Sequence, residues 1–405
     1  MDRRTFLAGI GAGGLAGLPL ALRAADRLVL SDELSAGTRA EAVLDALPGK
    51  RPLIKLSYRP PNYETPLAYF AEPITPNDAF FVRYHLARIP ETIDAQTWRL
   101  KLGGDAIETP GELSLDDLKR FEQVEPTAVC QCSGNRRGLF NPHVPGVQWG
   151  VGAMGCARWK GVRLKDVLAK AGLRKEAVEL VLDGADGAVL EKTPDFVKSL
   201  PIWKALDENV LIAFEMNGAP LPHFNGFPAR LVVPGWTGTY WMKHLTRLDA
   251  VSKPFDGFWM KSAYRIPKGR FPVVDRFLSQ ETADNTPITE MVVNTLITSP
   301  LPGQKLAARQ PTTVSGIAWD GGYGIQSVEV SSDDGASWQK ATLGPDVGRF
   351  AFRSWSARLP LAKPGARVIL AKATNRLGAS QPRELIPNPA GYHHNLVARV
   401  AVTAS

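Results

Sequence analysis

A short segment of the sequence brings a thiol close to two guanidinium groups. Cys132 is followed by Ser-Gly-Asn, which is typical of a tight turn, and then by Arg136 and Arg137. Guanidinium groups beside a thiol lower its pKa and favour the thiolate, the form that binds soft metals or attacks electrophiles. The sequence therefore indicates that Cys132 carries chemistry.

Three kinds of site could use this thiol. A zinc site would need a second Cys or His pair at ligand spacing, and Cys156 alone does not supply one. A nucleophilic cysteine would need a histidine partner, which the sequence does not place. A single metal–thiolate bond in a site made mostly by a cofactor needs only Cys132, and we favour this interpretation. For Cys130 and Cys156 we expect small buried side chains.

Further polar residues lie in segments before and after this one. Arg83 and His85 share one face if residues 80–85 form a strand, although Arg83 taken alone could be a surface residue. Asn225, Arg230 and Lys243 lie in loops rich in glycine at the ends of strands. Such loops suit an anionic, phosphate-bearing cofactor, but tight turns with solvated charges have the same composition.

These motifs together resemble the sulfite oxidase family of molybdenum enzymes. The matching segments are Phe80-Phe81-Val82-Arg83-x-His85, Cys132-Ser-Gly-Asn-Arg136-Arg137, Ala157-Arg158-Trp159-x-Gly161, Asn225-Gly-Phe-Pro-x-Arg230 and Gly238-x-x-x-x-Lys243. They occur in the order of the family, and the resemblance extends through nearly the whole mature chain. Within the family, the sequence is most similar to the catalytic subunits of bacterial periplasmic sulfite dehydrogenases.

The resemblance implies a set of catalytic residues. Cys132 would supply the thiolate bound to molybdenum, and Tyr264 lies at the position of the family's active-site tyrosine. Arg83, His85 and Arg137 would surround an oxyanion pocket. Trp149 aligns with a tryptophan of the pocket wall, although a core aromatic would look the same in sequence.

The same resemblance implies how the molybdenum–pterin cofactor is held. Asn225, Arg230 and Lys243 would bind the pterin phosphate and ring, and Asn225 replaces a histidine of the animal enzymes. Arg83 and His85 would also contact the cofactor. The chain has no His-Pro-Gly-Gly motif and no Cys-x-x-Cys-His motif, so we expect no haem in it.

The composition is that of a folded protein with more than one domain. At roughly 150 residues per domain, 405 residues correspond to two or three domains. The hydrophobic fraction of 44% and the charged fraction of 22% exclude a disordered protein. The 37 glycines and 32 prolines favour a loop-rich fold with β-structure, and no apolar run predicts stable membrane insertion.

The region from about 78 to 250 predicts an α+β fold. Ser114 is suited to cap a helix over 115–122, and a second helix over 162–171 would end at Gly172. The glycines of Gly150-x-Gly152-x-x-Gly155 lack a clear βαβ frame, so we reject a nucleotide site. Buried strands are predicted at 180–182, 210–212 and 231–233.

After about residue 290 the sequence predicts a β-sandwich of the immunoglobulin type. Asp333-Asp334-Gly335 is typical of a hairpin turn, and helical periodicity is absent. Strands are predicted at 314–319, 327–332, 336–341, 354–359 and 367–373.

We therefore expect three parts along the chain. Residues 1–25, with Arg3 and Arg4 before a Gly-rich apolar stretch, resemble a twin-arginine export signal, which predicts a periplasmic protein. Residues 26–288 would form the molybdopterin-binding catalytic domain, beginning with an extended arm over 26–75. Residues 289–405 would form the β-sandwich, which resembles the dimerisation domain of the family.

The implied activity is oxidation of sulfite to sulfate, with electrons passed singly to a c-type cytochrome. The expected partners are sulfite, the cytochrome, the twin-arginine export machinery and a second copy of the chain. The formal net charge of +8 favours an anionic substrate, and no basic run with interleaved aromatics points to nucleic acid. The alternatives are a molybdenum-dependent reductase of sulfoxides or related oxyanions, and a binding protein without catalysis, which would leave Cys132 unexplained.

Overall fold

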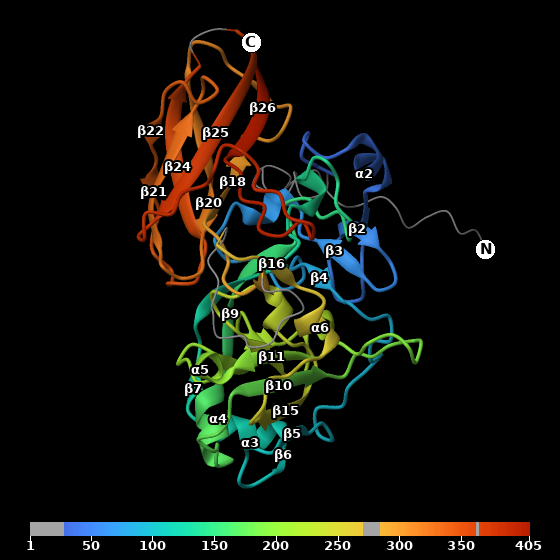
Figure 1. The fold of residues 1–405 in the computed structure, drawn as a ribbon. Coiled ribbons are helices and arrows are strands. Elements are labelled where there is room, and N and C mark those ends of the chain that lie inside the picture. The colour runs from blue at the N-terminus through green and yellow to red at the C-terminus, as the bar shows by residue number, and fades with distance from the viewer. Residues whose placement is uncertain (1–27, 270–283, 362–363) are drawn as a thin grey trace, which may run out of the picture.

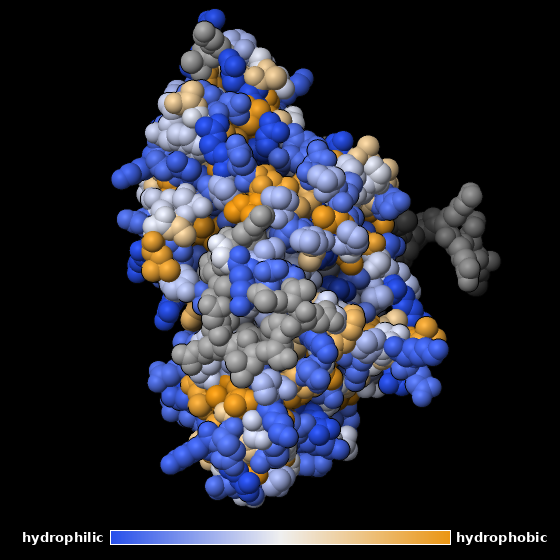
Figure 2. All heavy atoms as spheres, viewed as in Figure 1, coloured by the Kyte–Doolittle hydropathy of each residue, from blue (hydrophilic) through white to orange (hydrophobic). Residues whose placement is uncertain are grey.

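The computed structural model describes residues 28–269, 284–361 and 364–405. Figure 1 shows mixed sheets and short helices in the lower part of the molecule and two packed sheets in the upper part. The face drawn in Figure 2 is largely hydrophilic, with scattered apolar areas. The predicted export signal at 1–25 lies outside the described residues. In the described part of the chain, no helix has the length and apolar character needed to span a membrane.

The predicted arm over 26–75 does more than wrap a core, because it forms most of a sheet of its own. Leu53, Tyr63 and Val82 are buried in this sheet and pack together. A short helix, α2 (Ala36–Glu41), and a 3-10 helix, η1 (Leu67–Phe70), flank it. Its four strands are β1 (Val43–Asp45), β2 (Leu53–Ser57), β3 (Asn62–Glu64) and β4 (Val82–Arg83).

Two sheets form the lower domain, and its secondary structure is the predicted mixture of strands and helices. The first sheet has the order β11 (Lys198–Pro201), β10 (Glu179–Gly184), β15 (Leu245–Val251), β5 (Leu100–Gly103) and β6 (Gly111–Leu113). The second has the order β13 (Ala219–Pro220), β12 (Leu211–Met216), β9 (Met154–Arg163) and β7 (Gln123–Val124), with β14 (Arg230–Val232) on β12 and β8 (Thr127–Gln131) on β9. The three predicted strands correspond to β10, β12 and β14.

The helices of this domain are short. Ser114 caps α3 (Leu115–Lys119) through a capping box with Asp117, as its sequence predicts, but the helix ends three residues earlier than predicted. The helix predicted over 162–171 is α4 (Leu164–Lys170), because the preceding residues continue strand β9. The others are α5 (Ile202–Ala205), α6 (Phe258–Lys261), η2 (Arg137–Leu139), η3 (His223–Asn225) and η4 (Gly238–Tyr240).

The C-terminal part is the predicted β-sandwich, joined to the lower domain after the pair β16 (Arg265–Pro267) and β17 (Asn285–Pro287). Val314, Val328, Trp355 and Ile369 are buried between its sheets. One sheet has the order β18 (Asn294–Ser299), β20 (Pro311–Trp319), β24 (Arg353–Pro360) and β23 (Thr342–Leu343). The other has the order β19 (Lys305–Leu306), β26 (Ala398–Ala404), β25 (Gly365–Asn375), β21 (Ile325–Ser331) and β22 (Gln339–Lys340).

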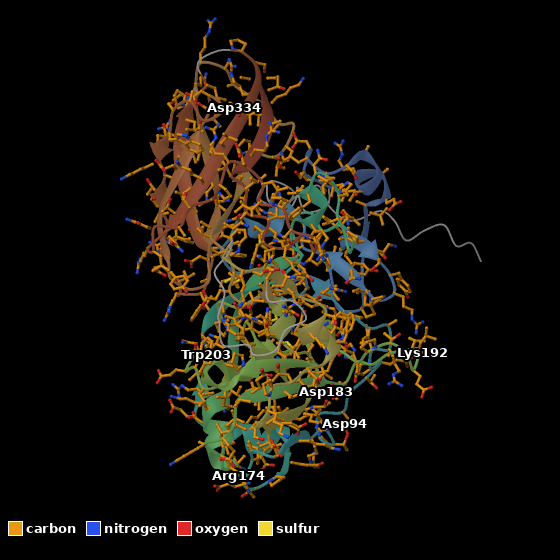
Figure 3. The ribbon with its side chains drawn as sticks, viewed as in Figure 1. Asp94, Arg174, Asp183, Lys192, Trp203 and Asp334 are labelled. Atoms are coloured by element: carbon orange, nitrogen blue, oxygen red, sulfur yellow. The ribbon has the colours of Figure 1, made fainter. Side chains whose placement is uncertain are left out.

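The strand predicted over 336–341 is mostly a turn. Asp333 accepts hydrogen bonds from the backbone N–H and hydroxyl of Ser337, at 2.9 and 2.6 Å, so only Gln339 and Lys340 pair as β22. Asp334 and Gly335 adopt positive φ angles, as the predicted hairpin turn requires. Figure 3 shows Asp334 on the sandwich and Lys192 at the end of a loop that projects from the lower domain.

Gly152 is required for close approach of two backbone segments rather than for a nucleotide. Its carbonyl oxygen accepts a hydrogen bond from the N–H of Thr65 at 2.9 Å. A Cβ added to it would lie 2.0 Å from the Thr65 carbonyl oxygen. The next residue, Ala153, accepts a hydrogen bond from the N–H of Cys132, so this contact supports the segment that carries the thiol.

Gly152→Ala should therefore destabilise the protein, since the added methyl group must push two backbones apart. We expect the apparent melting temperature to fall by about 5 °C or more in calorimetry. Gly37→Ala is a matched control, because Gly37 lies in α2 with no atom within 4 Å of the added Cβ. Equal melting temperatures for the two variants would contradict this packing argument.

Candidate active site

Two cavities meet at the segment that follows strand β8. Counting the space that is open to solvent, the inner cavity has a volume of about 640 Å³ and the outer cavity one of about 1330 Å³. Cys132, Arg83 and Tyr264 line both of them. A group bound in the inner cavity would therefore face whatever enters the outer one.

Strand pairing places the thiol of Cys132 at this junction. Strand β8 pairs with β9 up to Gln131 and Met154, and the N–H of Cys132 donates to Ala153 O at 2.9 Å. The carbonyl of Cys132 then accepts from Asn135 N at 2.9 Å, which closes the predicted turn. The Cys132 side chain lies at the mouth shared by the two cavities.

The other two cysteines are buried, as predicted from the sequence. Burial raises the pKa of Cys130 to about 11 and that of Cys156 to about 12. All three cysteines are free thiols. Cys130 touches the inner cavity, whereas Cys156 lines neither cavity.

The two consecutive arginines contact different parts of the C-terminal domain. Arg136 has a φ of 67°, and its guanidinium donates to Thr295 O of the sandwich at 2.7 Å. Arg137 donates to Ala390 O at 2.9 Å and lines the outer cavity. Of these two arginines, Arg137 is the one that lines the outer cavity and could meet a substrate there.

Arg83, His85 and Tyr264 form one contact group. Arg83 donates to Asn62 Oδ1 at 3.0 Å, and His85 Nε2 shares a hydrogen bond with the Tyr264 hydroxyl. The imidazole stacks on Phe196 with 3.6 Å between ring centroids. Burial, and then the positive charge of Arg83, lower the pKa of His85 well below its usual value, so the ring is neutral at neutral pH. Burial raises the pKa of Tyr264.

The three residues predicted to hold the pterin all line the inner cavity. Arg230 donates to Asn225 O at 2.9 Å and to Trp241 O at 3.1 Å, and its guanidinium lies 5.0 Å from the ring centroid of Trp159. Lys243 donates to Arg83 O at 2.6 Å. Burial lowers the pKa of Lys243, as expected for an ammonium group that has lost its water.

Comparison with known proteins gives the family of this chain. Residues 85–259 match the oxidoreductase molybdopterin binding domain, and residues 285–405 match the Mo-co oxidoreductase dimerisation domain. The chain is 36% identical over 377 residues to mitochondrial sulfite oxidase of Homo sapiens, covering 88% of this chain and 67% of that protein. It is 33% identical over 375 residues to sulfite oxidase of Gallus gallus, covering 88% and 79%.

The chain belongs to the sulfite oxidase family. It is also 35% identical over 357 residues to mitochondrial sulfite oxidase of Drosophila melanogaster, of which it spans 60% of the length and which covers 83% of this chain. Among solved structures, the sulfane dehydrogenase SoxCD of Paracoccus pantotrophus has a TM-score of 0.73 and 25% identity, covering 98% of this chain and 93% of that one.

The inner cavity fits the molybdenum–pterin cofactor that the sulfite oxidase family binds. Three buried polar atoms at its wall, Ser133 Oγ, Thr239 Oγ1 and Arg230 Nε, have no hydrogen-bond partner within the described residues. Buried donors of this kind need acceptors, because an unpaired polar group costs free energy. A cofactor with phosphate and ring oxygens would supply such acceptors, and a thiolate of Cys132 is the type of ligand that its metal would take.

Several residues of the site are not predicted by the motifs. Phe196 and Asp186 enter the inner cavity from the two ends of one loop, and Thr239 enters from η4. Ser133 also lines the inner cavity, and its position next to Cys132 in the sequence could have identified it as a site residue. Trp149 is fully buried and lines neither cavity, which fits a core aromatic rather than a pocket wall.

Lys50, from the N-terminal segment, supports Asn225. Its ammonium group donates to Asn225 Oδ1, to Phe80 O at 3.1 Å and to Asn77 O at 2.6 Å. Burial lowers the pKa of Lys50 from 10.5 to about 7. Asn225 is therefore held by a buried lysine more than 170 residues earlier in the chain, which no local pattern reveals.

Lys50→Met should change how stability depends on pH. Between pH 7 and pH 10.5 the unfolded chain keeps the proton on Lys50 and the folded protein releases it, so this residue makes the free energy of unfolding rise with pH. The variant should show a smaller rise than the wild type in urea unfolding measured from pH 7 to about 10. Lys101→Met, at an exposed lysine, is the control and should keep the wild-type slope. Parallel curves for wild type and Lys50→Met would contradict the burial of this charge.

Proposed function

We propose that this protein oxidises sulfite to sulfate at a molybdenum–pterin centre and passes the electrons singly to a c-type cytochrome. The observation that carries the proposal is the position of Cys132, between a cation-rich inner cavity and an outer cavity lined by Arg83 and Arg137. The bound cofactor supplies the two-electron redox chemistry and the oxygen atom that is transferred. The protein supplies binding, orientation and electrostatics.

Arg83 and Arg137 bind the substrate oxyanion from two sides. Each guanidinium offers several N–H donors in a plane, which suits two oxygens of a pyramidal anion. Arg83 is held by Asn62 and Arg137 by the carbonyl of Ala390, so both are oriented before the substrate arrives. Such preorganisation lowers the entropy lost on binding.

His85 and Tyr264 supply neutral groups beside these cations. The lowered pKa of His85 and the raised pKa of Tyr264 keep the ring and the phenol uncharged at neutral pH. A neutral phenol donates a hydrogen bond to a substrate oxygen without repelling its negative charge. With His85 Nε2–H as the donor of the hydrogen bond to the phenol oxygen, the hydroxyl hydrogen is left for the substrate, and the pair positions the oxyanion.

The cellular setting is part of the same proposal. The Arg3-Arg4 segment supports export by the twin-arginine machinery to the periplasm, where a c-type cytochrome would accept electrons and no haem would be needed in this chain. The match of residues 285–405 to a dimerisation domain supports a homodimer.

The test is sulfite-dependent reduction of ferricytochrome c by the exported protein, with molybdenum measured on the same sample. We expect turnover with about one molybdenum per chain and nearly none for Cys132→Ser, which removes the thiolate. Cys156→Ala is the control, because that thiol lies outside both cavities. Full activity of Cys132→Ser would mean that the metal is bound by another residue. Molybdenum without sulfite turnover would favour the sulfoxide or oxyanion reductase. A matured sample without molybdenum would contradict both the sulfite-oxidising and the reductase function.

Arg83→Gln should weaken the binding of sulfite more than it slows the reaction of bound sulfite. Loss of a charge-assisted contact should raise KM about tenfold or more, with a smaller change in kcat. Steady-state kinetics with saturating cytochrome measure both constants. Arg99→Gln, at an exposed arginine, serves as the control for loss of positive charge. An unchanged KM in Arg83→Gln would mean that Arg83 does not face the substrate.

A further inference from the structure

A segment of the sandwich domain closes one side of the outer cavity. Residues 388–392 lie between strands β25 and β26, and Pro389, Ala390 and Tyr392 line that cavity. The site is therefore built from both domains. The sequence motifs do not include these residues, and of them only the Ala390 carbonyl has been given a role above.

The ring of Tyr392 contacts two residues of the oxyanion site. It stacks on the ring of Tyr264, with 5.5 Å between centroids and 10° between planes. The guanidinium carbon of Arg137 lies 5.2 Å from the centre of the Tyr392 ring. A cation over an aromatic face and a stacked aromatic pair are both attractive, so Tyr392 restrains Arg137 and Tyr264 together.

The backbone around Tyr392 is itself fixed. The Asn388 side chain accepts from Tyr392 N at 2.9 Å and donates to Tyr392 O at 2.8 Å. Gly391 has a φ of 61°, and a Cβ there would lie 2.9 Å from Arg137 Cγ, so only glycine lets the segment approach the arginine this closely. The carbonyl of Ala390 accepts from Arg137 Nε and that of Val147 accepts from Nη1 at 3.3 Å, so the guanidinium is held where it lines the outer cavity.

Tyr392 also remains uncharged next to these groups. It is 7% exposed, and burial raises the pKa of its phenol, with Tyr264 as a further cause. The ring therefore adds no negative charge to a cavity that must admit an anion. The segment 388–392 thus offers Arg137 a carbonyl acceptor, an aromatic face and a rigid backbone.

We propose that Tyr392 is a positioning residue for oxyanion recognition, which holds Arg137 and Tyr264 in the geometry that binds the substrate. This inference rests on the proposed function, since it specifies how that site selects its anion. Removing the ring frees the guanidinium and the Tyr264 ring to move. The loss should appear in the binding of the anion, because the Tyr392 ring packs on Tyr264 and Arg137 and does not line the inner cavity.

The experiment compares Tyr392→Leu, Tyr392→Phe and the wild type as molybdenum-loaded protein. Two readouts are used: KM and kcat for sulfite, and the dissociation constant for sulfate measured by calorimetric titration, which requires no turnover. Trp338→Leu is the matched control, because Trp338 is an aromatic residue of the same domain that packs on Lys372, 4.5 Å from its ring centre. Molybdenum content is measured for every sample.

We expect Tyr392→Leu to raise both KM and the sulfate dissociation constant about tenfold, with kcat and molybdenum content within about threefold of wild type. Tyr392→Phe should bind sulfite and sulfate as the wild type does, since it keeps the ring. Unchanged binding constants in Tyr392→Leu, or a fall in kcat that only follows lost molybdenum, would overturn the inference. If the wild type does not oxidise sulfite, the proposed function fails, and the sulfate titration still decides the role of Tyr392.

Discussion

Buried positive charge around the inner cavity is the constraint on which the rest of the structure depends. Of the described residues that line this cavity, Arg83, Arg230 and Lys243 carry basic side chains, and Asp186 alone carries a carboxylate. Taking such groups out of water is costly unless they are paired. The lowered pKa values of Lys243 and Arg230 express this cost. An anionic cofactor would pair these charges and remove that cost. The same buried charges therefore lower the stability of the protein without the cofactor and favour its tight binding.

The hydrogen bonds that restrain Arg230 and Lys243 go to neutral acceptors, and Asp186 is the carboxylate of this cavity that interacts electrostatically with Lys243. Arg230 donates to two backbone carbonyls, and Lys243 donates to the carbonyl of Arg83. Carbonyl oxygens orient a cation while leaving its full charge for a ligand. Acidic partners would have neutralised the cavity and weakened its attraction for phosphate. The carbonyl acceptors and the buried polar atoms without partners at the cavity wall therefore both favour binding of an anionic cofactor.

Sequence reasoning predicted the parts of this site that are local in the chain. Cys132 and the turn after it are defined by hydrogen bonds within a few residues, and the capping box of Ser114 is equally local. Motif order and strand pattern likewise predicted the α+β domain, the sandwich and the membership of the sulfite oxidase family. The contacts of Lys50 with Asn225 and of Tyr392 with Arg137 join residues far apart in sequence. Only the packing of the sheets brings them together, so spacing along the chain carries no signal of them.

The divergence of Arg136 and Arg137 has a consequence for how such a protein can evolve. One arginine ties the thiol-bearing turn to the sandwich, and the other reaches a loop that the sandwich supplies. The residues that retain the cofactor lie in the other domain. Substitutions at residues 388–392, in the loop between β25 and β26, can therefore alter which anion is selected while the residues that line the inner cavity stay unchanged. Selection on substrate choice can therefore act in part on a stretch of the gene that encodes no residue of the inner cavity.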